Sequence, residues 1–185
     1  MADDEGSFWD FLAWFWLGAA LVLFGWWTIG DLNRAYWFPR LQRGRYWLSL
    51  WPLSWIWFVA YILFVFGAWN LWRTNGGWED AAGVLVVLLI TVFLTSLWHA
   101  AFFYMYHIDA SIVIILIALL FGITATIWAF VLDTVSGFLI LGLTLWILYV
   151  ALWTFFIRRM NTIDYRFKIY GTLDSKLTIQ VPNAG

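Results

Sequence analysis

Five long stretches of the sequence contain no Asp, Glu, Lys or Arg. They cover residues 11–29, 46–72, 81–103, 110–132 and 135–157. An α-helix needs about 20 apolar residues to cross the hydrocarbon layer of a bilayer, so each stretch is long enough to span it. The strands of a membrane β-barrel are shorter and alternate in polarity, which these stretches do not. The sequence therefore predicts an all-α membrane protein, a bundle of five transmembrane helices in which neighbours joined by short connections pack antiparallel.

The composition excludes a soluble domain. Charged residues make up 11% of the 185 residues and hydrophobic residues 64%, whereas a water-facing surface needs about 25–35% charged positions. The chain has no cysteine, which excludes disulfides and thiolate metal sites. A net charge of −1 gives no indication of a nucleic-acid partner.

The charged residues divide between the two predicted sides of the membrane. With five spans, nine of the ten basic residues fall on the side of the C-terminus. These are Arg34, Arg40, Arg43, Arg45, Arg158, Arg159, Arg166, Lys168 and Lys176. The opposite side carries Arg73 and most of the acidic residues. Because Lys and Arg favour the cytoplasmic side, we expect the N-terminus outside and the C-terminus in the cytoplasm.

The ends of the chain differ from its middle. The leader Met1–Asp10 has four acidic residues and no basic one, which is untypical of a cleaved signal peptide, so the first stretch is interpreted as a retained helix. After residue 161 the chain becomes polar and alternates with period two over residues 165–169 and 176–181. This pattern predicts a short β-hairpin outside the membrane. The expected organisation is a transmembrane domain over residues 1–161 and a polar tail over 162–185.

Aromatic residues recur at fixed positions along the spans. The first loop contains Trp37-Phe38-Pro39-Arg40, and the second span continues with Trp51, Trp57, Tyr61, Gly67 and Trp72. The third span contains Thr91, Thr95, Trp98, Phe102 and Phe103, and the fifth contains Leu143, Trp146, Tyr149 and Thr154. With these residues on five spans, residues 11–161 resemble the TspO/MBR family of tryptophan-rich sensory or translocator proteins. The family's third-helix Gln and Asn are Thr91 and Thr95 here, and its fifth-helix Pro-Tyr is Gly142-Leu143, which indicates a divergent member.

The resemblance implies a ligand pocket between the second, third and fifth helices. The residues expected to line it are Trp57, Tyr61, Thr91, Thr95, Trp98, Trp146, Tyr149 and Val150. Large planar rings suit a flat ligand such as a porphyrin, held by stacking and oriented by a few hydroxyls. Contacts from the first loop are expected from Trp37, Arg40, Arg43 and Arg45, whose guanidinium groups suit porphyrin propionates. The alternative is ordinary helix packing, in which each Thr bonds a carbonyl of its own helix.

The sequence offers little for iron ligation or catalysis. His99 and His107 are eight residues apart on a predicted helix, or about 12 Å, so they cannot ligate one iron from opposite sides. We therefore expect no obligate cofactor and no metal site, with a porphyrin or haem-type molecule as ligand. No span has an ionisable residue at its centre, which disfavours an ion-coupled transporter. No catalytic constellation is recognisable, so we expect a protein that is not an enzyme.

Two functions remain open. The first is a TspO-like membrane receptor or translocator that binds porphyrins or other flat hydrophobic molecules. The second is an accessory subunit of a larger membrane complex, favoured by the excess of aromatic residues and by a tail hairpin that can extend a partner's sheet. Small residues such as Gly18, Ala19 and Gly67 favour close helix contacts, either within the bundle or in a homodimer. Membrane lipids are the other expected partner.

Overall fold

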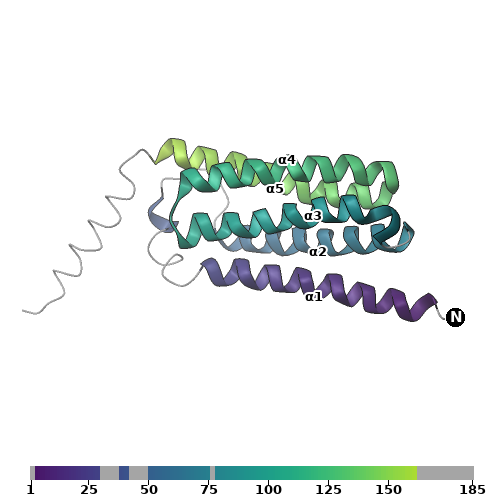
Figure 1. The fold of residues 1–185 in the computed structure, drawn as a ribbon. Coiled ribbons are helices and arrows are strands. Elements are labelled where there is room, and N and C mark those ends of the chain that lie inside the picture. Colours follow the sequence, from purple (N-terminus) through teal and green to yellow (C-terminus); the bar gives the residue numbers. More distant parts are fainter. Residues whose placement is uncertain (1–2, 30–37, 42–49, 76–77, 162–185) are drawn as a thin grey trace, which may run out of the picture.

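The computed structural model describes residues 3–29, 38–41, 50–75 and 78–161. Over these residues the chain forms α1 (Asp3–Ile29), the 3₁₀ turn η2 (Phe38–Arg40), α2 (Leu50–Thr74), α3 (Trp78–His99), the π-helical turn η3 (Ala100–Tyr104), α4 (Ile108–Leu132) and α5 (Thr134–Met160). Figure 1 shows the five long helices side by side, with α1 along the outside of the bundle next to α2 and α3.

The predicted five-helix membrane bundle is confirmed for the part of the chain described. Five helices are long and apolar enough to cross a membrane, and the described residues include no strand. The helices extend beyond the charge-free stretches at several ends, and α1 begins at Asp3, inside the acidic leader. The predicted tail hairpin lies outside the described residues.

Glycines allow the helices of the main bundle to approach closely. A Cβ atom on Gly142 of α5 would lie 2.8 Å from Leu63 of α2, and one on Gly83 of α3 would lie 2.3 Å from the indole of Trp128 on α4. Hydrocarbon chains solvate apolar side chains as well as protein does, so membrane helices associate through such tight packing and through hydrogen bonds between helices.

Polar groups join helices at three levels of the bundle. Near the middle, the hydroxyls of Thr126 on α4 and Thr144 on α5 lie 2.8 Å apart, and Thr144 also donates to the carbonyl of Gly122 at 3.1 Å. At one end of the bundle, Asp109 of α4 pairs with Arg158 of α5. The third level, at the other end, consists of the residues that begin α5.

Asp133 caps the N-terminus of α5 and also binds α2. Its carboxylate accepts a hydrogen bond from the backbone N–H of Ser136 at 2.7 Å and another from the side-chain amide of Asn70 at 2.7 Å. Partial burial acts to raise the pKa of Asp133, but the donors on Ser136 and Asn70 outweigh it and hold that pKa below its ordinary value. The ionised carboxylate therefore stabilises the junction between α2 and α5.

The C-terminal end of α3 widens into the π turn η3 before α4 begins. There the N–H of Met105 bonds the carbonyl of Ala100, five residues back. One extra residue in the turn changes which side chains face inward, and both Phe102 and Phe103 are fully buried. Tyr106 then adopts a left-handed backbone with φ of 57°, which turns the chain into α4.

Candidate aromatic ligand site

Trp57 of α2 lies at the centre of a group of aromatic rings. Its ring centroid is 5.7 Å from that of Tyr61, 5.9 Å from Trp98, 4.5 Å from His99 and 5.7 Å from Trp146. Further ring contacts extend the group along α3, η3 and α5. We call the whole set the aromatic cluster; its members are Trp57, Tyr61, Trp98, His99, Phe102, Phe103, Trp146, Tyr149 and Trp153.

Helical spacing explains why these rings meet. Trp57 and Tyr61 are four residues apart on α2, as are Trp98 near the end of α3 and Phe102 in the η3 turn that continues it. On α5, Trp146 is followed by Tyr149 three residues later, and their rings stack at 5.0 Å. Side chains three or four residues apart lie on one face of a helix, so three helices each present an aromatic face to the same space.

The indole nitrogens of the cluster lack hydrogen-bond acceptors. The Nε1 atoms of Trp57, Trp98, Trp146 and Trp153 are all buried, and within the described part of the chain none has a partner. A buried tryptophan N–H normally finds an acceptor, and a donor left unpaired costs about 1–3 kcal/mol. The cluster thus combines stacking surfaces with four donors that a guest molecule can satisfy.

The two threonines predicted for the pocket bond their own helix. Thr91 donates to the carbonyl of Val87 at 2.9 Å, and Thr95 donates to that of Val92 at 2.7 Å, as the helix-packing alternative predicts. Their surroundings differ. Thr91 faces α4, because its methyl group is 3.5 Å from the Cβ position of Gly122. Thr95 lies at the edge of the aromatic cluster, because its carbonyl oxygen is 2.9 Å from Nδ1 of His99.

The remaining predicted residues divide between α5 and the first loop. Val150 is fully buried in the core. Trp37, Arg43 and Arg45 lie outside the described residues, and the side chain of Arg40, which ends η2, is also outside them.

Residues absent from the predicted lining complete the cluster. Phe38 of η2 is 2% exposed, and its ring lies 5.9 Å from those of Phe103 and Trp153. The first loop therefore reaches the cluster through Phe38. The imidazole of His99 is buried, with Nδ1 2.9 Å from the carbonyl oxygen of Thr95. A carbonyl only accepts hydrogen bonds, so Nδ1 carries the proton. The sequence contained signals for both residues, since Phe38 lies in the aromatic loop motif and His99 directly follows Trp98.

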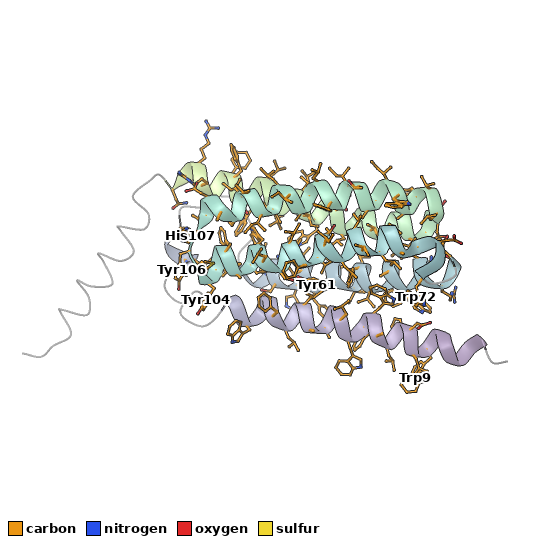
Figure 2. All side chains as sticks on the ribbon, in the orientation of Figure 1. Trp9, Tyr61, Trp72, Tyr104, Tyr106 and His107 are labelled. Atoms are coloured by element: carbon orange, nitrogen blue, oxygen red, sulfur yellow. The ribbon has the colours of Figure 1, made fainter. Side chains whose placement is uncertain are left out.

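Two cavities lie on the α1 side of the cluster. The larger, about 470 Å³, is between α1 and α2 and is lined by apolar residues such as Phe15 and Phe58 together with Tyr61. Tyr61 therefore contacts both this cavity and Trp57, and Figure 2 shows it midway along the bundle. The smaller cavity, about 280 Å³, involves α1, α2 and α3. The described residues contain no group of three or more His, Cys, Asp or Glu placed to hold a metal ion.

The sequence profile of the TspO/MBR family matches residues 13–160, from the first half of α1 to the end of α5. The chain belongs to this family. The suspected resemblance is thus confirmed, and the protein is a TspO-like integral membrane protein with several spans. A search of curated proteins finds no match to the chain.

Proposed function

We propose that this TspO/MBR protein is a membrane receptor or translocator that binds porphyrins or other flat hydrophobic molecules at the aromatic cluster. The observation that carries the proposal is the set of four buried indole N–H groups without acceptors, placed among stacked rings. Ordinary core packing gains nothing from buried donors left unpaired, whereas a planar guest with nitrogen or oxygen acceptors gains both stacking and hydrogen bonds.

A guest binds by replacing contacts between rings of the protein with contacts to its own π surface. Trp57 and Trp146 meet edge to face at 85°, so rotation of either indole exposes a flat surface to the guest. Acceptors on the guest then receive the indole N–H groups. The arginines of the first loop pair with its carboxylates near the membrane surface. Binding requires no bond-breaking step, so we assign the protein no catalytic residue and no obligate cofactor.

Porphyrin titration of the protein in lipid nanodiscs tests this function. We expect the porphyrin Soret band to shift on binding, and Trp57→Ala or Trp146→Ala to weaken the affinity about tenfold, since each removes a stacking surface worth roughly 0.5–1.5 kcal/mol and an indole donor. Trp55→Ala is the matched control, because Trp55 is on the same helix as Trp57 but is 54% exposed to lipid. Unchanged affinity in both cluster variants would remove the proposed site.

The charge distribution supports an orientation with the N-terminus outside and the C-terminus in the cytoplasm. Arg158 and Arg159 lie in the last turn of α5, whereas Asp80 lies in the first turn of α3 at the opposite end of the bundle. The chain has no native cysteine, so single cysteines at these ends report the side directly. A membrane-impermeant thiol reagent should label Asp80→Cys from outside and leave Arg159→Cys unlabelled in intact cells. The reverse pattern would invert the orientation.

A second candidate function, a subunit of a larger membrane complex, is favoured by the outer face of α1. Only 18% of its span is buried inside the chain, and large rings are exposed along it. These include Phe8, Trp9, Phe15, Trp16 and Trp27. Native mass spectrometry from a mild detergent separates the candidates, because a stable partner protein would be retained with a subunit of a larger complex, whereas a monomer or homodimer alone would count against an accessory role.

A further inference from the structure

The smaller of the two cavities combines a carboxylate with two indole rings. It has a volume of about 280 Å³. Its lining consists of Asp10, Ala13, Trp14 and Leu17 from α1, Trp72 from α2 and Leu89 from α3. None of these residues belongs to the aromatic cluster, so the cavity is a separate feature of the molecule.

The lining is polar at one end and apolar at the other. Asp10, Ala13, Trp14 and Leu17 follow the spacing i, i+3, i+4 and i+7, which places them along one face of α1. Asp10 is near the start of the first span, whereas Leu17 lies about 10 Å further along the helix, toward the bilayer centre. Trp72 is in the last turns of α2, which lie beside the first turns of α1, and Figure 2 shows it at the same end of the bundle as Trp9.

Asp10 has no positively charged partner within the described residues. The ion pair found there joins Asp109 and Arg158 at the opposite end of the bundle. Arg73, a cation at the same end as Asp10, lies over the ring of Trp69 at 5.0 Å from its centroid. A carboxylate at the end of a membrane span that lines a cavity and has no cationic partner is available to a ligand of opposite charge.

We propose that this cavity binds an alkylammonium group attached to a hydrocarbon chain. The ammonium lies against the Asp10 carboxylate and the indoles of Trp14 and Trp72, whose centroids are 6.2 Å apart and whose planes are inclined at 66°. Such rings attract a cation through their π faces. The hydrocarbon chain extends along Ala13, Leu17 and Leu89. The ammonium is carried either by the headgroup of a phospholipid or by a free amphiphilic amine.

Spin-labelled probes in phosphatidylglycerol bilayers test the proposal, because this host lipid has no ammonium group. The first two probes carry the same labelled C18 chain and differ only in the head group, which is trimethylammonium in one probe and an alcohol in the other. Electron paramagnetic resonance measures the fraction of each probe that is immobilised on the protein. We expect about a fivefold preference for the ammonium probe, since each cation–π contact contributes roughly two- to fivefold.

Matched variants separate the site from general charge attraction. Asp10→Asn should abolish the preference, whereas Asp80→Asn, which removes the same charge from an exposed residue at the same end of the bundle, should retain it. If Asp10→Asn fails to assemble, Leu17→Trp fills the deep end of the cavity, keeps the carboxylate and should also reduce the preference. Equal immobilisation of the two probes by the wild-type protein, or an equal preference in Asp10→Asn, would overturn the proposal.

A second pair of probes identifies the source of the ammonium. Preferential immobilisation of spin-labelled phosphatidylcholine over phosphatidylglycerol supports a lipid headgroup. Preference for the single-chain ammonium probe without preference for phosphatidylcholine supports a free amphiphilic amine. Both results support the site, and neither depends on porphyrin binding at the aromatic cluster.

Discussion

The two sides of the bundle are held together in different ways. On one side, α4 and α5 are joined by buried hydrogen bonds between Thr126, Thr144 and Gly122, and about half of the α5 span is buried. On the other side, α1 lies against α2 and α3 with 18% of its span buried, and both described cavities open beside it. The hydrogen bonds between helices and the described cavities thus lie on opposite sides of the bundle. The α1 side is not loosely packed throughout, because a Cβ atom on Gly18 would lie 2.5 Å from Val65 of α2.

Among variants that test this contrast, the largest loss of stability is expected from adding a side chain at the closest contact between α4 and α5. A Cβ atom on Gly137 would lie 2.4 Å from the ring of Phe130. We expect Gly137→Ala to lower the free energy of unfolding by about 1–3 kcal/mol, because the ring and the helix must shift. Thermal unfolding in detergent measures the change.

Gly25 of α1 is the matched control for this substitution. A Cβ atom there would lie 3.7 Å from the ring of His99, which is ordinary contact. Gly25→Ala should therefore be neutral or stabilise the helix by up to about 1 kcal/mol, because Ala has the higher helix propensity. Equal destabilisation by Gly137→Ala and Gly25→Ala would show that α1 is packed as tightly at Gly25 as α5 is at Gly137.

A smaller loss is expected at the junction of α2 and α5. Asp133→Ala removes the N-cap of α5 and the bond from Asn70, and loss of an N-cap costs about 1 kcal/mol. The pKa of Asp133 is lowered in the folded state, so its contribution is complete above the unfolded-state value of about 3.9 and is lost as the pH falls through the folded-state value.

The pH dependence of unfolding isolates this contribution. The loss of stability on acidification below about pH 4 should be smaller in Asp133→Asn than in the wild type. Asp80→Asn, which removes the same charge from an exposed position, is the control for the change in net charge. If Asp133→Asn kept the pH dependence of stability seen in the wild type, groups other than Asp133 would be responsible for the loss of stability in acid.

A loss of about 0.6 kcal/mol, and at most about 1.7, is expected from Thr144→Val, the typical range for a hydrogen bond between membrane helices. The substitution keeps the shape of the side chain but removes the bonds to Thr126 and to the carbonyl of Gly122. Thr124→Val is the control, because Thr124 is exposed and bonds the carbonyl of Leu120 on its own helix. The difference between the melting temperatures of the two variants gives the contribution of the interhelical hydrogen bonds. Equal melting temperatures would show that these bonds contribute nothing and that α4 and α5 are joined by packing.

The sequence predicted the bundle because the thickness of the bilayer sets the length of a membrane-spanning helix at about 20 residues. A stretch of about that length without charged residues therefore identifies a span directly. It also predicted that Trp57, Trp98 and Trp146 meet, since their positions follow helical spacing within a recognisable family register. It did not predict that Thr91 faces α4. The direction of a residue at the edge of a helix face depends on the rotation of the helix, and nearly all-apolar helices specify this rotation weakly. The π turn that buries both Phe102 and Phe103 left no periodicity to detect.

The smallest effect is expected at the ion pair between Asp109 and Arg158. The pair joins the same two helices as Thr126 and Thr144, but the side chain of Asp109 is 65% exposed. Exposed pairs contribute about 0–1 kcal/mol and are screened by salt, so Asp109→Asn should lower the melting temperature slightly at low ionic strength and leave it unchanged at high salt. A salt-independent loss as large as that of Thr144→Val would show that the ends of α4 and α5, and not only their buried middle, hold this side of the bundle rigid.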